Sequence, residues 1–147
     1  MISPELLRRY PYFAPIQDAT LKKLAMIAQE KTIPAGQTVF QEWQRADCLY
    51  VIRSGEVDVR YMLPGGACQS VDSLNEGDLL VWSAMVPPYH TTGRGVTTRD
   101  TQVIAFEAAK LRQLCDEDPQ LGFRLMSQIV RLLAERLEGA RVQLAVA

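Results

Sequence analysis

The spacing of apolar residues separates the chain into helical ends and an extended middle. Ser3 and Pro4 form a helix-start signal for a short helix, and Asp18 opens a second helix whose apolar residues recur every three or four positions. From 31 to 107 this spacing gives way to short runs rich in Val, Ile and Tyr, which glycine-containing turns interrupt. The pattern predicts strands for these runs, which are 38–40, 48–52, 57–62, a run around Val71, 78–81, 96–98 and 103–106.

The helical spacing returns after Phe106 and lasts almost to the C-terminus. It predicts one helix over 108–117 and a long helix that starts at Asp118-Pro119. The apolar stripe of the long helix runs for about five turns, longer than a small β-barrel covers. The stripe either packs on its own domain or forms the seam of a two-helix dimer. We favour the dimer, whose seam residues are then Ile129, Leu133, Leu137, Ala140 and Leu144.

Together these elements predict one domain over 1–147 of the α+β, mostly β class. We expect an antiparallel β jelly-roll barrel over 31–107, short N-terminal helices over 1–30, and C-terminal helices over 108–147 that end in the long dimerisation helix. With 147 residues, 48% of them hydrophobic, the chain can bury one proper core, and nothing in it demands a second domain.

Composition argues against several classes of protein. A net charge of −1 and a pI near 5.8 disfavour a protein whose main work is to coat nucleic acid. The three cysteines are far apart and contain no C-x-x-C pair, which indicates neither a disulfide framework nor a zinc site. No stretch approaches the ~20 apolar residues of a membrane span, so we expect a soluble, cytoplasmic protein without membrane contact. Nucleophile-elbow, phosphate-loop and zinc-protease motifs are missing, and the prediction is that the chain is not an enzyme.

The segment 76–106 is the candidate for a ligand pocket, and we refer to its part 76–100 as the cassette. An extended run leads into a short helical turn, a Pro-Pro break and a Thr/Gly-rich stretch, and a second extended run follows. Such a turn presents free backbone N–H groups to a small ligand. Trp82 either plugs the site or stacks on a planar ligand, Ser83 either caps the turn or binds an anion, and His90 either lies on the surface or contacts the ligand.

Four stretches carry a resemblance to a known family. They are IPAGQTVFQE, CLYVIRSGEVDV, LNEGDLL and AAKLRQLCDEDPQLGFRLMSQIVRLL. In their order and in the placement of their turn glycines, they resemble the cyclic-nucleotide-binding domains of the catabolite activator and fumarate-nitrate regulator superfamily. The resemblance covers nearly the whole chain. It implies a small-molecule-sensing domain with a phosphate-binding cassette and a C-terminal dimer helix.

The ligand contacts that this resemblance implies are altered in the sequence. Val81 stands where the family has the cassette glycine, and Trp82 stands where it has the ribose-binding glutamate, with Ser83 and Ala84 following. The position of the phosphate-binding arginine falls near Thr91, beside His90 and Thr92, and Arg94 is a weak candidate for the missing charge. On the long helix, the purine-contacting positions of the family fall on Leu132, Arg136 and Leu137. We take the chain for a divergent, stand-alone branch in which ordinary cyclic AMP recognition is lost.

Two functions follow from this reading. The first is a regulatory sensing module with a degenerate cassette, whose ligand is a nucleotide or another small anion and whose dimer surface is read by another protein. The tentative ligand site is then Val81, Trp82, Ser83, Ala84, His90, Thr91, Thr92, Arg94, Leu132 and Arg136. The second is a dimerisation or scaffold domain with a dead pocket. No definite cofactor is predicted. The family's transcription factors have DNA-reading helices after this domain, for which this sequence leaves no room, so no direct nucleic-acid binding is expected from it. Either its output passes through a partner protein, or a DNA-binding part belongs to a longer chain.

Overall fold

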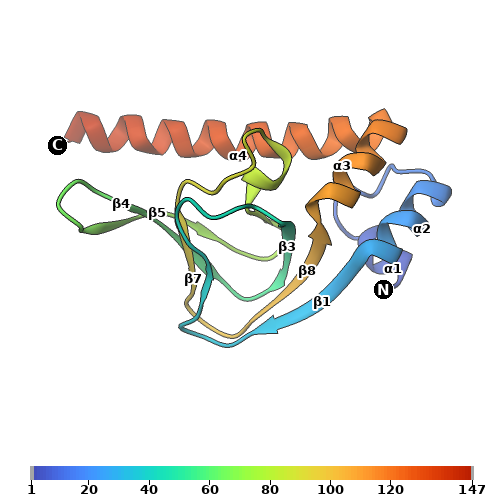
Figure 1. The fold of residues 1–147 in the computed structure, drawn as a ribbon, viewed down its shortest axis with the longest axis horizontal. Coiled ribbons are helices and arrows are strands. Elements are labelled where there is room, and N and C mark those ends of the chain that lie inside the picture. Colours follow the sequence, from blue (N-terminus) through green and yellow to red (C-terminus); the bar gives the residue numbers. More distant parts are fainter. Residues whose placement is uncertain (1, 147) are drawn as a thin grey trace.

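The computed structural model describes residues 2–146, with side chains through Ala145, as two antiparallel sheets flanked by helices (Figure 1). One sheet has the strand order β1-β8-β3-β6 and the other β2-β7-β4-β5. The strands are β1 (Ala28–Ile33), β2 (Thr38–Phe40), β3 (Cys48–Ser54), β4 (Val57–Met62), β5 (Cys68–Leu74), β6 (Leu79–Leu80), β7 (Arg94–Thr97) and β8 (Thr101–Glu107). The predicted mostly β, jelly-roll fold is confirmed, although the sheets stay open where the prediction had a closed barrel.

Strand β1 was missed because its sequence does not look like a strand. Residues 28–30 were assigned to the N-terminal helices, yet the helix ends at Ile27 and extended backbone begins at Ala28. The strand reads AQEKTI and is mostly exposed, so it lacks the alternation of apolar and polar residues that marks a half-buried strand. It forms because it pairs in register with β8, from Ala28 opposite Phe106 to Ile33 opposite Thr101.

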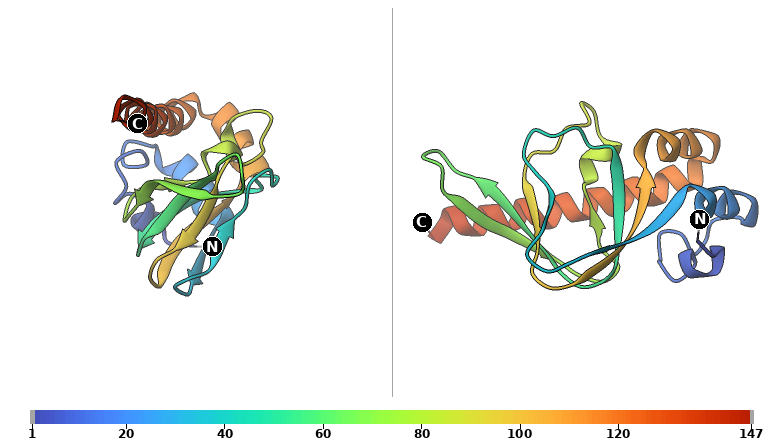
Figure 2. Two further views of the ribbon diagram at one scale, coloured as in Figure 1. Left: turned by 90° about the vertical axis from the view of Figure 1, so that its left-hand side faces the viewer. Right: turned by 60° about the horizontal axis from the view of Figure 1, so that its bottom comes forward.

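The helices gather at one end of the sheets, and the last of them runs along the side of the molecule (Figures 1 and 2). They are α1 (Pro4–Leu7), α2 (Asp18–Ile27), α3 (Ala108–Glu117) and α4 (Pro119–Val146). An aromatic cluster joins the N-terminal segment to the sheets: the ring of Phe13 lies 5.7 Å from that of Phe106, and the hydroxyl of Tyr12 donates to the carbonyl of Gly77 at 2.9 Å. The N-terminal segment thereby supports the turn that starts the cassette.

Asp118, the residue before the first turn of α4, is buried between helices. Its side chain accepts a hydrogen bond from the Thr20 hydroxyl at 2.7 Å and a longer one from Gln17 at 3.4 Å, both from the start of α2. It also accepts from the backbone N–H of Gln120 in the first turn of α4. These hydrogen bonds hold the pKa of the Asp118 carboxyl below its usual value, and the bond from Thr20 has the largest effect. Asp118 therefore ties α2 to the junction of α3 and α4.

Helix α4 has two apolar faces. One face packs into the core and consists of Leu121, Leu125, Ile129 and Leu132. Ile129 is only 1% exposed, so its placement in the dimer seam was wrong. The second face repeats every three and four residues along the helix, with Phe123, Met126, Val130, Leu133, Leu137, Ala140 and Leu144. We call this set the α4 seam. Most of it is exposed, including Val130 at 61% and Leu137 at 64%.

Candidate ligand site between the cassette and helix α4

The cassette backbone turns sharply where it enters the site. Gly77 has a φ of 88° and leads into β6, and Val81, with φ 66° and ψ 58°, ends that strand in the left-handed conformation. Val81 is thereby the cap of a short 3₁₀ helix, η1 (Trp82–Met85). A β-branched residue in this conformation carries about 1–2 kcal/mol of strain. The surrounding packing must therefore hold the turn in place.

A small cavity lies between η1, the β2-β7-β4-β5 sheet and α4. Its walls are mostly apolar, and its polar side chains are Tyr61, Ser83, Thr91, Thr92 and Arg136. The open space is about 20 Å³, room for roughly one water molecule. Pockets for small organic ligands usually measure about 300–1,000 Å³. The cavity is therefore closed in this conformation, and a ligand could enter only after one of its walls has moved.

Seven of the ten predicted site residues line this cavity. They are Val81, Trp82, Ser83, Thr91, Thr92, Leu132 and Arg136. Ala84 lies behind them, fully buried, and its carbonyl accepts a hydrogen bond from Arg112 of α3 at 2.6 Å. Ala84 is thus a packing residue that helps to fix η1 against α3. The cassette and α4, about fifty residues apart in the sequence, do meet at one place.

Thr91 lines the cavity, but its polar groups are engaged elsewhere. Its hydroxyl bonds to the carbonyl of Gln41 and accepts from the backbone N–H of Gln44 at 3.0 Å. Its own N–H donates to the Gln44 carbonyl at 2.8 Å, and its carbonyl accepts from the N–H of Trp43 at 3.0 Å. Thr91 therefore fastens the 41–46 loop to the cassette, which leaves little of its bonding capacity for a ligand.

His90 and Arg94 lie outside the cavity, so the prediction that they join the same pocket was wrong. His90 is exposed, with Nδ1 2.8 Å from the carbonyl of Pro88, and it lines a separate outer hollow of about 550 Å³ beside α3. Arg94 alternates along β7 with the buried Gly95, so it points away from the core, and it pairs with Glu42 at 3.3 Å. The cassette therefore supplies no arginine to the cavity walls within residues 2–146.

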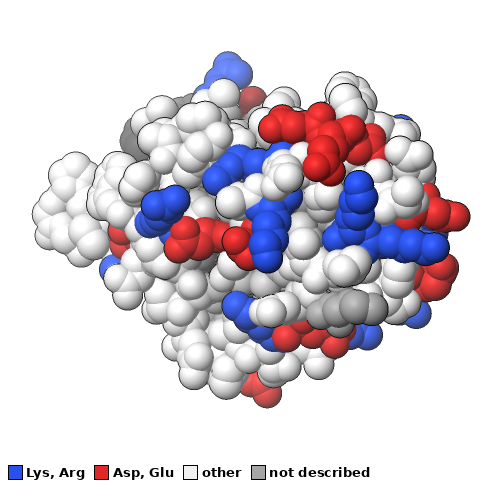
Figure 3. Space-filling view, turned by 45° about the vertical axis from the view of Figure 1, so that its right-hand side comes forward, with Lys and Arg blue, Asp and Glu red and all other residues white. Residues whose placement is uncertain are grey.

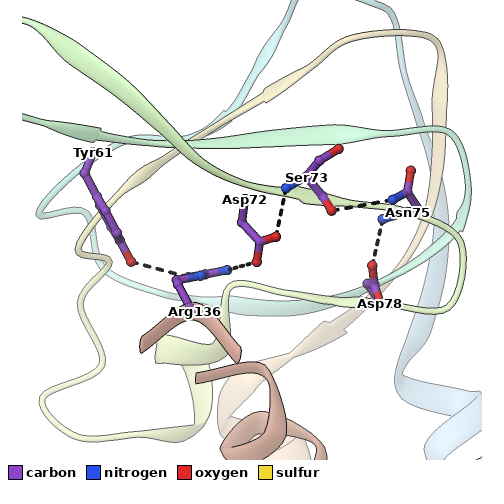
Figure 4. A network of polar contacts seen from close by, with 6 residues as sticks. All are labelled: Tyr61, Asp72, Ser73, Asn75, Asp78 and Arg136. Carbon is purple, nitrogen blue, oxygen red and sulfur yellow. Dashed lines mark hydrogen bonds and ion pairs between the residues drawn. The ribbon is translucent and has the colours of Figure 1, made fainter. Parts of the chain in front are cut away.

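Arg136 enters the cavity from α4 and meets two side chains that the sequence analysis did not single out (Figure 4). One Nη lies 3.4 Å from the Tyr61 hydroxyl and the other 3.4 Å from Asp72 Oδ2. The Arg136 side chain is only 11% exposed, and its Nε has no hydrogen-bond partner among the described residues. Tyr61 could have been found from the alternation of inward residues along β4, where it follows the buried Val59.

The polar contacts continue from Arg136 to the start of the cassette (Figure 4). The backbone N–H of Ser73 donates to Asp72 at 2.9 Å, and the side chain of Asn75 reaches the Ser73 carbonyl at 3.5 Å. The backbone N–H of Asn75 donates to Asp78 at 2.8 Å. A chain of hydrogen bonds thus runs from α4, along the end of β5, to the turn that precedes β6.

The surface around α2 and α3 has no field of one sign. Figure 3 shows Lys and Arg side chains interleaved with Asp and Glu side chains on this face. Two of the ion pairs there are Lys23 with Glu117 at 3.7 Å and Lys110 with Glu107 at 3.4 Å. A face of this kind does not provide the clustered positive charge that binding to a phosphate backbone needs.

Within residues 2–146, no helix has the length and apolar character that crossing a membrane would require.

The fold and the cavity define a class of protein. A family model of the cyclic nucleotide-binding domain matches residues 30–118, which is more than half of the chain. The chain therefore belongs to the cyclic nucleotide-binding domain family, as the sequence motifs predicted. This class of domain is regulatory and senses ligands; it is not a class of enzyme.

Particular relatives agree with this assignment. The CRP-like cAMP-activated global transcriptional regulator of Mycobacterium tuberculosis is 26% identical over 141 residues, covering 96% of this chain and 61% of the regulator. The chain thus spans about three-fifths of the length of that relative. A solved structure from Geobacter metallireducens GS-15, assigned to the cyclic nucleotide-binding proteins, is 34% identical, covers 93% of this chain and 99% of that chain, and has a TM-score of 0.81. The Thermus thermophilus catabolite activator protein, 22% identical with 92% and 62% covered and a TM-score of 0.74, shares the fold.

Proposed function

We propose that this domain is a regulatory sensor that holds a small ligand between η1 and α4 and works as a homodimer through the α4 seam. The main support for the proposal is that neighbouring residues of helix α4 line the cavity and form the seam. Leu132 and Arg136 line the cavity, while Leu133 and Leu137 belong to the seam. A ligand that moves α4 at the cavity therefore has to change the seam as well, which is how a binding event could reach a partner.

The cassette of this sensor is degenerate, and its ligand is not cyclic AMP bound in the manner that the family resemblance implies. Val81 and Trp82 replace the glycine and the glutamate of that pattern, and the hydrogen-bonding groups of Thr91 are engaged by the 41–46 loop. A charge-assisted arginine-phosphate contact and a carboxylate-hydroxyl bond each contribute roughly 1.5–3 kcal/mol. Without both, cyclic AMP should bind about 10² to 10⁴ times more weakly than in a site that has them.

The downstream reader of the sensor is proposed to be another protein. Support comes from the net charge of −1 and from the interleaved charges around α2 and α3, which do not favour nucleic acid as a direct partner of these residues. Relatives in the comparison include longer regulators, of which this domain corresponds to one part. The α4 seam and the surfaces next to it are the places where a change in the dimer could be read.

A second candidate function is a dimerisation scaffold with a dead pocket. The closed cavity favours it, because only about 20 Å³ is open and the half-buried Trp82, the first residue of η1, forms part of the wall. This candidate keeps the α4 seam and gives up the ligand. The two functions therefore differ in one property, which is whether any small molecule stabilises the folded dimer.

A thermal-shift screen separates the two functions, because a ligand that binds only the folded state raises the melting temperature. The screen would contain cyclic AMP, cyclic GMP, cyclic dinucleotides, linear nucleotides and the organic anions described below. A saturable rise with one ligand class supports the sensor. A flat response to the whole screen contradicts it and leaves the scaffold.

A further inference from the structure

The charge in the cavity lining comes from helix α4. Arg136, on α4, is the one charged residue in the cavity lining within residues 2–146, and Tyr61 stands beside it. The cassette contributes an apolar part of the lining, which is built from Leu79, Leu80, Val81 and Trp82. A ligand that fits this arrangement carries a negative group towards α4 and an apolar body towards the cassette.

The hydrogen bonding of Arg136 is incomplete in a way that suits an anion. A guanidinium has five N–H donors in a planar fork, and removing its charge from water costs free energy unless those donors are used. Both contacts of Arg136 are 3.4 Å long, and its Nε is buried without a partner among the described residues. A carboxylate or phosphate group could accept two N–H bonds from the fork at shorter distances.

Two neighbouring side chains, Asp72 and Trp82, have to move when a ligand binds. Asp72 is the carboxylate that now shares Arg136, and its side chain is 29% exposed, so it can turn to water when another anion takes its place. Trp82 is half-buried, and its indole lies against the core at the cassette end. Because the open space is about 20 Å³, the indole has to move aside for the body of a ligand. The body that fits best is therefore itself a single flat or compact apolar group.

From these contacts we infer that the cavity takes a small organic anion, with its carboxylate or phosphate on Arg136 and a compact aromatic or branched apolar body under η1. This inference rests on the proposed sensor function and names its ligand class. The anion takes the place of Asp72 as the ion-pair partner of Arg136. Arg136 directly precedes the seam residue Leu137 in the sequence. Binding therefore removes the ion pair that joins α4 to β5 beside the seam, while the bond from Gln69 of β5 to Gln143 of α4 remains.

The test compares matched probes on the whole chain by thermal shift. Benzoate, phenylacetate and indole-3-carboxylate supply the carboxylate, phenyl phosphate supplies the phosphate, and benzamide and indole-3-carboxamide are neutral controls of the same shape. We expect one or more of the anions to raise the melting temperature and the amides to leave it unchanged. Intrinsic fluorescence in a Trp43→Phe background, where Trp82 is the remaining tryptophan, should change over the same concentration range.

Three variants assign the effect to the proposed contact. Arg136→Gln should weaken the anion at least about tenfold while the protein stays folded, and Arg131→Gln, an exposed arginine on the same helix, should leave binding as in the wild type. Asp72→Asn removes the competing carboxylate and should tighten the anion about tenfold. If Arg136→Gln does not fold, Asp72→Asn alone still decides, because binding that is unchanged in Asp72→Asn contradicts the competition.

The outcomes for the ligand class and for the sensor function can be told apart. Equal shifts with benzoate and benzamide, or an anion shift that survives in Arg136→Gln, would overturn the assignment of the anion to Arg136. A nucleotide that binds the wild type and Arg136→Gln equally well would keep the sensor and overturn this ligand class. No shift with any nucleotide or anion would overturn both.

Discussion

At the scale of single residues, Val81 is the most informative position in the cassette. Its side chain is buried and lines the cavity, but its backbone has φ 66°, a conformation that glycine adopts at little cost and valine does not. The alignment of the motifs had placed Val81 where the family has a glycine. The backbone at this position has therefore kept the shape that a glycine would favour, while the side chain fills space next to η1.

Replacing Val81 by glycine should be unusually well tolerated for a buried valine. The change loses about 1.5–2 kcal/mol of side-chain burial and about 1 kcal/mol through the flexibility of glycine in the unfolded chain. It also relieves about 1–2 kcal/mol of backbone strain. Val103→Gly in β8, at a buried valine with strand geometry, is the control that lacks this relief. In urea unfolding, Val81→Gly should cost about 1–2 kcal/mol less than Val103→Gly, and an equal or larger loss would contradict the strain.

Residue-level roles were predictable from the sequence where they depend on chain position and not where they depend on side-chain partners. The motif alignment placed Trp82, Ser83 and Leu132 at the cavity, because turn glycines and helix periodicity fix the register of the backbone. It could not show that Thr91 bonds to the 41–46 loop, since Gln44 lies almost fifty residues earlier. Arg94 was judged by its charge alone, whereas its place in the alternation of β7 turns it outward.

At the scale of elements, the helices were predictable and one strand was not. Caps and first-turn prolines located the starts of α1 and α4, and the apolar spacing located α2 and α3. Strand β1 depends on its partner β8, so no local pattern marks it. The run 78–81 gave only a two-residue strand because Val81 leaves the extended conformation. Local sequence patterns therefore predict the helices, whereas the extent of strands such as β1 depends on pairing with a neighbouring strand.

The bond between Thr20 and Asp118 gives a prediction about elements and pH. Thr20→Val removes the hydroxyl and keeps the shape, so near neutral pH it should destabilise the protein by about 1–2 kcal/mol. The pKa of Asp118 is lowered in the fold, chiefly by Thr20, so its contribution is fully present above the ordinary carboxyl pKa of about 3.9 and is lost progressively as the pH falls from there through the lowered pKa of the folded state.

Urea unfolding of the wild type and Thr20→Val at about pH 7 and about pH 3 measures this dependence. The difference in unfolding free energy between the two proteins should be smaller at the lower pH, because the stabilisation that depends on the Asp118 carboxylate decreases as the pH falls towards its lowered pKa. Thr32→Val, on an exposed threonine of β1, serves as the control and should show a small difference at either pH. A difference for Thr20→Val that stays constant would show that Asp118 does not carry the bond as a carboxylate.

At the scale of the whole molecule, the α4 seam is the feature that a single domain leaves exposed. Its residues recur every three and four positions over three heptads, the spacing of a left-handed two-helix coiled coil. The sequence predicted the apolar stripe but did not separate its buried face from its exposed face. Helical periodicity alone does not show which apolar residues of the helix pack on their own domain. The position of the sheets decides this, by burying Ile129 and leaving Val130 exposed.

A charge in the seam should separate the dimer. Val130→Glu places two carboxylates opposite each other in the proposed interface and should weaken dimerisation by about 10²-fold or more. Arg131→Glu introduces the same residue one position along, outside the seam, and should leave the dimer in place. Sedimentation equilibrium of the three proteins measures the effect. A wild type that is monomeric at micromolar concentration, or an Arg131→Glu variant that dissociates as readily as Val130→Glu, would argue against the seam.

In the proposed sensor, helix α4 joins the ligand cavity to the dimer seam, and native mass spectrometry tests ligand binding and dimerisation together. The wild type would be measured alone and with each member of the nucleotide and organic-anion screen. We expect a dimer with twice the mass of the 16.5 kDa chain, which takes up as many as two ligand molecules from one chemical class. A monomer, or a dimer that takes up none of the compounds, would contradict the account.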